Sequence, residues 1–250
     1  MPAKSKIEWT ESTWNPVTGC TKISDGCDNC YAYRMANRLK CMGSPKYSQG
    51  FEVVLHDYCL QYPLKWKRPS LIFVNSMSDL FHDEVPLEFI QKVFEVMNEA
   101  SWHVFQLLTK RSERLSQLAE YLIWTPNIWQ GVTVESKKYV DRIEHLRNVP
   151  ASIKFVSFEP LLGNIGDIDL SGIDWAIVGG ESGPKAREMD ADWVLALKKN
   201  CDNQAIPFYF KQWGGTNKKK AGRLLLGKTW DAFPEFDIYK NTQYEIHDRK

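Results

Sequence analysis

The sequence lacks any apolar run that approaches the ~20 residues needed to span a bilayer. Its first residues, MPAKSKIEWTEST, also lack the apolar core of a secretory signal, so we expect a cytoplasmic protein with no membrane partner. The glycine patterns that cradle nucleotide phosphates, GxGxxG and GxxxxGKS/T, do not occur. These absences argue against a membrane protein and against the common dinucleotide and P-loop sites.

The sequence has almost no excess of either charge. Lys and Arg total 32 against 31 Asp and Glu, which gives a net charge of +1. This balance gives no support for binding nucleic acid by bulk electrostatic attraction, although a local basic patch is compatible with it. With 43% hydrophobic and 25% charged residues, the 250-residue chain has the composition of a soluble protein with one full core.

Short apolar runs alternate with amphipathic stretches, a pattern typical of parallel strands joined by helices. A weak first strand is predicted at 14–19, and stronger ones at 51–55, 71–75, 103–108, 128–134, 153–158, 175–178 and 207–210. Helical spacing of apolar residues predicts helices around 32–39, 90–97, 115–122, 139–146 and 194–201, with Pro86 and Asp190 or Asp192 placed at helix starts.

Eight strands alternating with helices predict an α/β fold, namely a (βα)8-like TIM-type barrel that is either complete or partial and irregular. A doubly wound open sheet is the alternative. We expect the barrel to occupy residues 1–215 and a polar C-terminal extension to occupy 216–250. The run Lys218–Lys220 in that extension is interpreted as a solvated loop, with phosphate contact as the minority interpretation.

Three of the six cysteines, Cys20, Cys27 and Cys30, lie in one short segment. In a reducing compartment, clustered cysteines indicate metal binding or catalysis rather than disulfides. The Cys-x-x-Cys pair lets two thiolates converge on one metal centre, and Gly19 and Gly26 permit the tight turns that such a loop needs.

The number of cysteines distinguishes two kinds of metal site. Thiolates suit both zinc and iron–sulfur clusters, but a structural zinc site normally has four protein ligands. A four-iron cluster held by three cysteines instead leaves one iron open to a substrate or cofactor. Cys41, Cys59 and His56 are the candidates for a fourth ligand. The count of three favours the iron–sulfur cluster and leaves zinc as the alternative.

Polar groups follow the ends of the predicted strands, where a barrel builds its active site. Taken singly, each is ordinary turn or cap chemistry, but their convergence on one rim indicates an enzyme. A carboxylate at Glu159 also requires a cationic partner, for which Lys110, Arg111 and Lys211 are candidates. The candidate site residues are Asn75, Ser76, Ser78, Lys110, Thr133, Glu135, Glu159, Glu181, Lys211, Gln212 and Trp213.

With a cysteine loop after the first strand of a barrel, the chain resembles the radical S-adenosylmethionine enzymes. Nearly the whole chain also resembles an uncharacterised bacterial and phage family with a three-cysteine motif. The matching strings are IEWT (7–10), WNPVTGC (14–20), FVNSMSDLFH (73–82), LTKR (108–111), IVGGESG (177–183) and FKQWG (210–214).

The resemblance to radical S-adenosylmethionine enzymes implies a function. Cys20, Cys27 and Cys30 would hold a 4Fe–4S cluster whose open iron takes the amino and carboxylate groups of S-adenosylmethionine. Reductive cleavage, which needs an electron donor, then yields a 5′-deoxyadenosyl radical that abstracts hydrogen from the substrate.

The same resemblance implies roles for the strand-end residues. Those from Asn75 to Glu181 would bind the cofactor, and Lys211, Gln212 and Trp213 would lie nearer an unknown substrate, with nucleic acid as a candidate. The alternative is a zinc-stabilised protein that binds or processes nucleic acid, in which the tryptophans and Lys218–Lys220 contact the strand.

Overall fold

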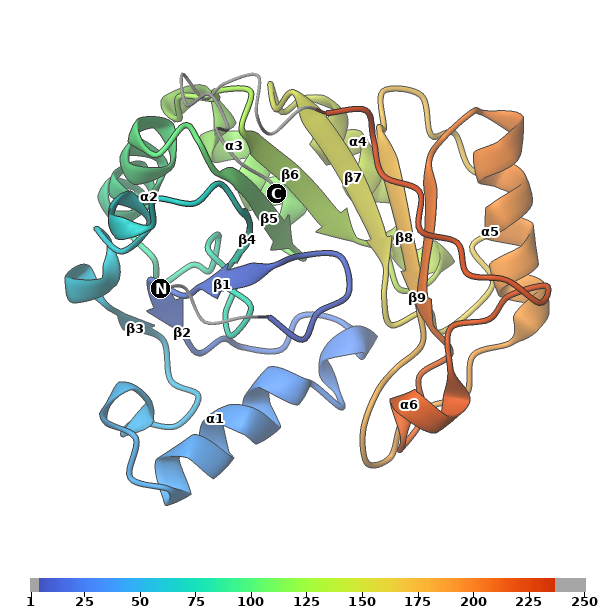
Figure 1. Cartoon of the computed structure of the whole chain (residues 1–250), viewed down its shortest axis with the longest axis horizontal. Coiled ribbons are helices and arrows are strands. Elements are labelled where there is room, and N and C mark those ends of the chain that lie inside the picture. The colour runs from blue at the N-terminus through green and yellow to red at the C-terminus, as the bar shows by residue number, and fades with distance from the viewer. Residues whose placement is uncertain (1–4, 237–250) are drawn as a thin grey trace, which may run out of the picture.

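Seven parallel strands form one curled sheet in this computed structural model, which describes residues 5–236 apart from the side chains of residues 218 and 219. The strands follow their chain order across the sheet, so all their carboxyl ends meet at one rim (Figure 1). They are β1 (Ser12–Trp14), β4 (Leu71–Val74), β5 (Val104–Thr109), β6 (Ile128–Thr133), β7 (Ile153–Phe158), β8 (Trp175–Gly179) and β9 (Phe208–Gln212).

Four helices cover the outer face of this sheet (Figure 1), and their apolar stripes pack on buried strand residues such as Ile72 and Val156. The apolar spacing predicted all four. Pro86 directly precedes the second helix of the chain, and Asp190 caps the fifth by accepting a hydrogen bond from the Asp192 N–H at 2.8 Å. The four helices are α2 (Leu87–Glu99), α3 (Ser112–Leu118), α4 (Asp141–Arg147) and α5 (Ala191–Asn203).

Two further helices lie at the rim, below the sheet in Figure 1, and short 3-10 turns connect several elements. The rim helices are α1 (Tyr31–Cys41), predicted from its apolar spacing, and α6 (Lys218–Ala221). The 3-10 turns are η1 (Asp25–Cys27), η2 (Pro45–Tyr47), η3 (Asp57–Cys59), η4 (Pro63–Lys65), η5 (Ala119–Tyr121) and η6 (Lys137–Tyr139).

The structure corrects the predicted strand count. The segment at 51–55 is not a barrel strand, because its strand β3 (Val54–Leu55) pairs antiparallel with β2 (Val17–Thr18) outside the main sheet. Both residues of β3 are only half-buried, unlike the strands of the barrel. The first barrel strand, β1, ends before Pro16, whose ring removes the N–H that a continuing strand would need. The prediction of a strand at 14–19 was therefore misplaced.

The fold is thus a seven-stranded partial barrel rather than a complete (βα)8 barrel. The alternative of a doubly wound open sheet was wrong, because that fold requires the strand order to reverse at a switch point. Here the order β1-β4-β5-β6-β7-β8-β9 runs in one direction throughout.

Aromatic side chains fill the inner face of the sheet. Trp9, Phe73, Trp129, Phe155, Trp175 and Tyr209 form one buried cluster. Gly131 makes room for it, because a Cβ at this position would lie 2.4 Å from the ring of Phe155. Burying one such ring contributes about 1.5–3 kcal/mol to stability. The cluster therefore makes the inner face of the sheet a well-packed apolar core next to the rim.

The described part of the predicted C-terminal extension packs against this barrel. The Phe210 N–H donates to the Trp230 carbonyl at 2.8 Å, and the ring of Phe233 lies 4.6 Å from that of Trp175 between centroids. The lysine run begins the short helix α6 rather than an open loop. The boundary after residue 215 stays a prediction, and residues 237–250 lie outside the described part of the chain. Across residues 5–236, none of the helices has the length and apolar character needed to cross a membrane.

Candidate functional site

A cavity of about 530 Å³ lies at the rim, within the usual range for a small-molecule site. It brings together most of the residues predicted from the strand ends, and Trp9, Phe73 and Phe51 add aromatic walls. The predicted residues that line it are Cys20, Cys27, Cys30, Asn75, Ser76, Ser78, Lys110, Thr133, Glu159, Glu181, Lys211 and Gln212.

Two predicted site residues lie outside the cavity wall. Glu135 is fully buried behind the segment that carries the three cysteines, residues 20–30, which we call the cysteine loop. The Glu135 carboxylate pairs there with Arg142. Trp213 packs on Phe210, and its indole N–H donates to the Leu224 carbonyl at 2.8 Å. Neither contact was visible in the sequence, because each depends on a segment whose path is set by tertiary packing.

The local backbone structure differs at each of the three cysteines. Cys20 follows Gly19, whose φ of +83° and whose close approach to the Glu52 carbonyl exclude any larger residue. Cys27 ends the 3-10 turn η1, and Cys30 caps the N-terminus of α1.

The three thiols lie near one another at the cavity. They are close enough for Cys27 and Cys30 to influence Cys20, whose pKa is raised to about 12 by burial, by Asp79 and by these two thiols, against the lowering effect of Arg111. Within residues 5–236, however, no group of three or more His, Cys, Asp or Glu side chains is arranged to hold one metal ion. By chemical type, thiolates suit both zinc and iron–sulfur clusters, so the donor set fits either.

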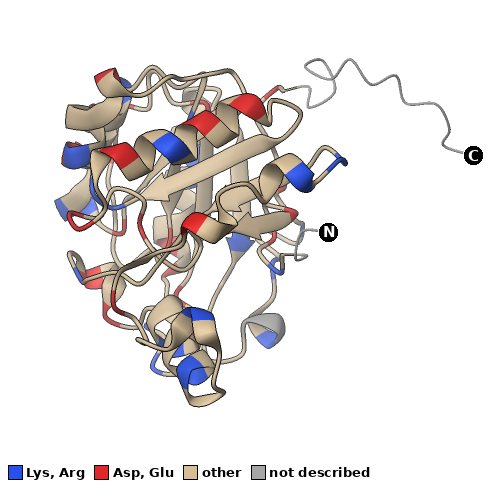
Figure 2. Ribbon diagram, turned by 90° about the vertical axis from the view of Figure 1, so that its left-hand side faces the viewer, with Lys and Arg blue, Asp and Glu red and all other residues tan. Residues whose placement is uncertain are grey.

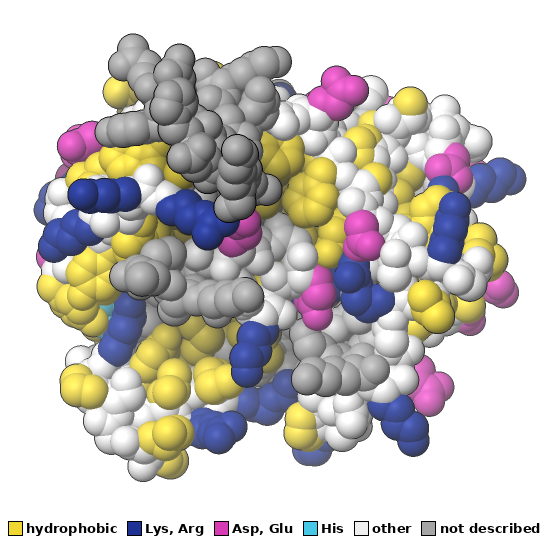
Figure 3. All heavy atoms as spheres, viewed as in Figure 1, with side chains coloured by type: hydrophobic (Ala, Val, Ile, Leu, Met, Phe, Trp, Pro, Cys, Tyr) yellow, Lys and Arg dark blue, Asp and Glu magenta, His cyan; other side chains and the backbone are white. Residues whose placement is uncertain are grey.

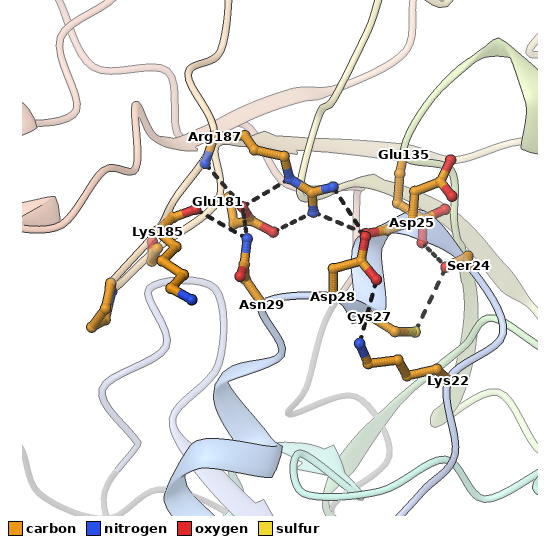
Figure 4. A network of polar contacts seen from close by, with 12 residues as sticks. Lys22, Ser24, Asp25, Cys27, Asp28, Asn29, Glu135, Glu181, Lys185 and Arg187 are labelled. Atoms are coloured by element: carbon orange, nitrogen blue, oxygen red, sulfur yellow. Dashed lines mark hydrogen bonds and ion pairs between the residues drawn. The ribbon is translucent and has the colours of Figure 1, made fainter.

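A buried carboxylate on β8's side of the cavity holds the cysteine loop (Figure 4). Glu181 follows β8, is 5% exposed, and accepts a hydrogen bond from Asn29 between the second and third cysteines at 2.9 Å. Arg187 donates to the same carboxylate from its backbone N–H and its guanidinium, and also to the Asp25 carbonyl at 2.8 Å. Burial alone would raise the pKa of Glu181, but the hydrogen bonds from Arg187 and Asn29 outweigh it and lower the pKa.

A second buried carboxylate holds the loop from β6's side. Glu135 accepts a hydrogen bond from the Ser24 hydroxyl within the loop, and its other oxygen pairs with Arg142 at 2.8 Å. Gly26 rests against this carboxylate so closely that a Cβ there would lie 2.5 Å from a Glu135 oxygen. The side chains of Glu135 and Glu181 are therefore engaged with the loop, while their predicted role in cofactor binding stays untested.

Several buried polar atoms at the cavity have no hydrogen-bond partner among the residues that the structure describes. They are Asn75 Nδ2, Thr133 Oγ1, Ser157 Oγ, Gln212 Oε1 and Trp9 Nε1, all of which belong to cavity-lining residues. An unpaired buried polar atom costs about 1–3 kcal/mol. A set of them around one cavity indicates a site that a polar ligand completes.

Glu159 and Lys211 form an ion pair at the cavity, in which Lys211 Nζ lies 2.6 Å from Glu159 Oε1. This confirms that Glu159 has a cationic partner and selects Lys211 from the three candidates. Lys110 instead approaches Glu135 at 3.8 Å, and Arg111 pairs with Asp83 at 2.9 Å.

Sequence reasoning missed three residues that matter here. Ser157 lies opposite Thr133 in the β6–β7 register, and a polar residue within a buried strand was the available signal. Asp79 was not among the candidate site residues, yet its carboxylate accepts hydrogen bonds from the Thr109 hydroxyl and the Lys110 N–H. Arg187 lies in a loop and had no signal at all.

A family model described as "Protein of unknown function (DUF5131)" matches residues 4–234. The chain belongs to this family. The predicted membership of an uncharacterised family is thereby confirmed, while the three-cysteine motif and the bacterial and phage distribution of that family stay predictions. The chain has no match among curated proteins.

Solved structures of spore photoproduct lyase share the fold. A single-residue variant superposes with a TM-score of 0.55 at 11% identity, over 85% of this chain and 79% of that chain. A variant with bound AdoMet and dinucleoside spore photoproduct gives 0.50 at 11% identity, over 80% of this chain and 63% of that one. The chain therefore spans less than two thirds of the latter's length, and the similarity shows a common partial-barrel fold alone.

The hydrogen bonds that Glu181 accepts from Asn29 and Arg187 predict that the stability of the protein depends on pH. Because its pKa is lowered on folding, Glu181 contributes stability that is fully present above about pH 4.5 and is lost as the pH falls through the folded-state value. A Glu181→Gln variant should lose about 1–3 kcal/mol of unfolding free energy at pH 7, less than a fully buried pair because Arg187 is partly exposed. Urea unfolding at several pH values measures the difference.

Glu144→Gln is the matched control, since Glu144 pairs with Arg147 at the surface and its side chain is 66% exposed. We expect this control to change stability by less than about 0.5 kcal/mol. The difference between wild type and Glu181→Gln should shrink below pH 4.5. A difference in unfolding free energy that stays constant or grows in acid would contradict a stabilising role for the ionised Glu181.

Proposed function

We propose that this chain is a radical S-adenosylmethionine-type iron–sulfur enzyme. The observation that carries the proposal is a cavity at the rim whose lining includes both the three cysteines and residues with unpartnered buried polar atoms. Metal ligands and a polar ligand site within one partly aromatic cavity are what such an enzyme requires, because its cofactor must contact the cluster directly.

Cys20, Cys27 and Cys30 would hold a 4Fe–4S cluster. The loop that carries them is fixed on both sides by Glu135 and Glu181, which supports a site that keeps its shape without a fourth cysteine. When bound, the cluster would supply the single electron that cleaves the cofactor, after an electron donor has reduced it. The chain's own part is to keep three thiols facing the cavity and to leave room for the cofactor beside them.

Cavity residues would bind S-adenosylmethionine. The Asn75 amide offers an unpartnered donor for a carboxylate, and the hydroxyls of Thr133 and Ser157 offer donors and acceptors for ribose or amino groups. Ser76, Ser78, Lys110, Glu159 and Glu181 complete the proposed cofactor set. The structure of the neighbour that contains AdoMet supports a partial barrel of this kind as a scaffold for that cofactor.

Lys211 and Gln212, at the end of β9, would lie nearer the substrate. The substrate of this chain is unknown, but a nucleic acid is the leading candidate, because solved neighbours contain a dinucleoside spore photoproduct. Trp213 no longer belongs to this set, since it packs outside the cavity.

The zinc alternative is less well supported. It requires four ligands around one ion, and within the described part of the chain the candidates Cys41, Cys59 and His56 do not complete such a group. Cys41 is exposed beyond the cavity, whereas Cys59 is buried near Lys46, whose Nζ lies 3.5 Å from its sulfur.

Anaerobic reconstitution with iron and sulfide tests the cluster. The wild-type chain should become brown and hold roughly four irons, because three thiols and a sulfide-bridged core account for that stoichiometry. Cys27→Ala should lose the colour and most of the iron. Absorbance together with iron and sulfide content measures both.

Cys41→Ala is the matched control, because Cys41 ends the same helix that Cys30 begins but is exposed away from the cavity. It should reconstitute as the wild type does. A colourless wild-type protein that carries one zinc, or equal loss of iron in both variants, would refute the assignment.

Cofactor binding has a second test at Ser157. Its hydroxyl has no partner among the described residues, so Ser157→Ala should not lower the melting temperature. The same change should weaken S-adenosylmethionine binding by about five- to tenfold, since a hydrogen bond worth about 1 kcal/mol is lost. Calorimetric titration of the reconstituted chain and a thermal melt measure the two effects.

Ser112→Ala serves as the matched control, because the Ser112 hydroxyl is bonded to His145 Nδ1 at 2.9 Å and lies outside the cavity wall. It should lower the melting temperature and leave cofactor affinity unchanged. The opposite pattern in the two variants would count against a ligand role for Ser157.

A further inference from the structure

Helix α1 presents an unusual surface beside the cavity. Its side chains Tyr31, Tyr33, Met35, Arg38 and Lys40 are exposed, as is Met42 directly after the helix, and together they form what we call the α1 surface. A helix that buries only Ala32 and Ala36 exposes an uncommon amount of large side-chain area. Large exposed apolar side chains grouped in this way mark a binding surface.

The charge of this segment differs from that of the whole chain. Between Asp28 and Glu52 there is no acidic residue, whereas there are four basic ones, although the complete chain has a net charge of only +1. Figure 2 shows the contrast with α2, which carries Glu88, Glu95 and Glu99 and one basic residue, Lys92. In Figure 3, hydrophobic and basic side chains cover the lower left of the molecule, where α1 lies, without acidic ones between them. A polyanion is the partner that complements this charge.

The α1 surface continues into the cavity. Tyr31 and Met35 belong to it and also line the cavity wall. Helical spacing places Tyr31, Met35 and Arg38 along one side of α1, at i, i+4 and i+7, and this side leads away from the cavity. Tyr33 and Lys40, at i+2 and i+9, lie about half a turn further round the helix. A partner that crosses the exposed part of α1 from these two residues to the side of Tyr31 reaches the cavity without leaving the protein surface.

We propose that the α1 surface binds single-stranded nucleic acid and presents one of its bases to the cavity. Arg38 and Lys40 provide the positive charge that phosphates require, and Tyr33 provides an exposed ring on which a base stacks. A cavity of about 530 Å³ is too small for a duplex, so the target base must be unstacked to approach it. The inference deepens the proposed function by naming its substrate class, and rests on that function only for the chemistry in the cavity.

Fluorescence anisotropy with a labelled 20-nucleotide oligothymidylate tests the proposal on the full chain. The Arg38→Ala/Lys40→Ala variant should bind about tenfold more weakly than the wild type at low salt. Its slope of log affinity against log salt should be shallower by about 1.4, since two phosphate contacts are lost. An oligouridylate arm asks whether RNA or DNA is preferred, and a duplex of the same length should bind more weakly.

A charge-matched control comes from Lys67→Ala/Arg68→Ala. Both residues are exposed, precede β4 at the end of the sheet opposite the rim, and change the net charge by the same amount. Tyr33→Ala should weaken binding about fivefold, whereas Tyr121→Ala, whose side chain is 55% exposed against 57% for Tyr33, should have no effect. An Arg38→Lys/Lys40→Arg variant should retain binding, which separates charge from misfolding.

Three outcomes overturn the proposal: no salt-dependent binding by the wild type, equal losses in the α1 and control variants, or binding to phosphatidylserine vesicles but not to the strand. The measurement does not need a cluster, so it fails or succeeds separately from reconstitution. If the chain binds the strand but cannot be reconstituted with a cluster, the proposed function fails and this inference stands.

Discussion

The cysteine loop depends on two buried carboxylates that reach it from opposite sides. Glu135 bonds Ser24 in the first half of the loop, and Glu181 bonds Asn29 in the second half. Each carboxylate follows a strand and has its own arginine, Arg142 or Arg187, so its charge is compensated within the protein. A buried carboxylate without such a partner would be strongly unfavourable, which makes both pairs a condition for the loop's position.

This arrangement connects the fold to the site. The parallel strands carry Glu135 and Glu181 to the same rim, and the loop between them places three thiols at the cavity. The buried aromatic cluster, which includes Trp129 and Phe155, fills the inner face of the sheet. The rim is therefore polar and open, whereas the region below it is apolar and packed, as a site that binds a polar cofactor requires.

Much of this could be predicted from the sequence, because periodic apolar residues and strand-end polar groups are local signals. The helices at 90–97 and 194–201 and the convergence of Asn75, Thr133 and Gln212 were foreseen. The segment at 51–55 was misassigned because a short apolar run has the same appearance in a barrel strand and in a peripheral two-stranded pair. Arg187 and Trp213 could not be placed, since their contacts depend on how distant loops fold together.

The proposed function requires that the three thiols hold a cluster with one iron open to S-adenosylmethionine. Electron paramagnetic resonance of the reduced, reconstituted chain tests it most directly, with and without the cofactor. The account predicts a paramagnetic cluster signal that changes when S-adenosylmethionine is added, because the cofactor occupies the open iron. A cluster signal that is identical in both samples, or a protein that holds only zinc, would contradict it.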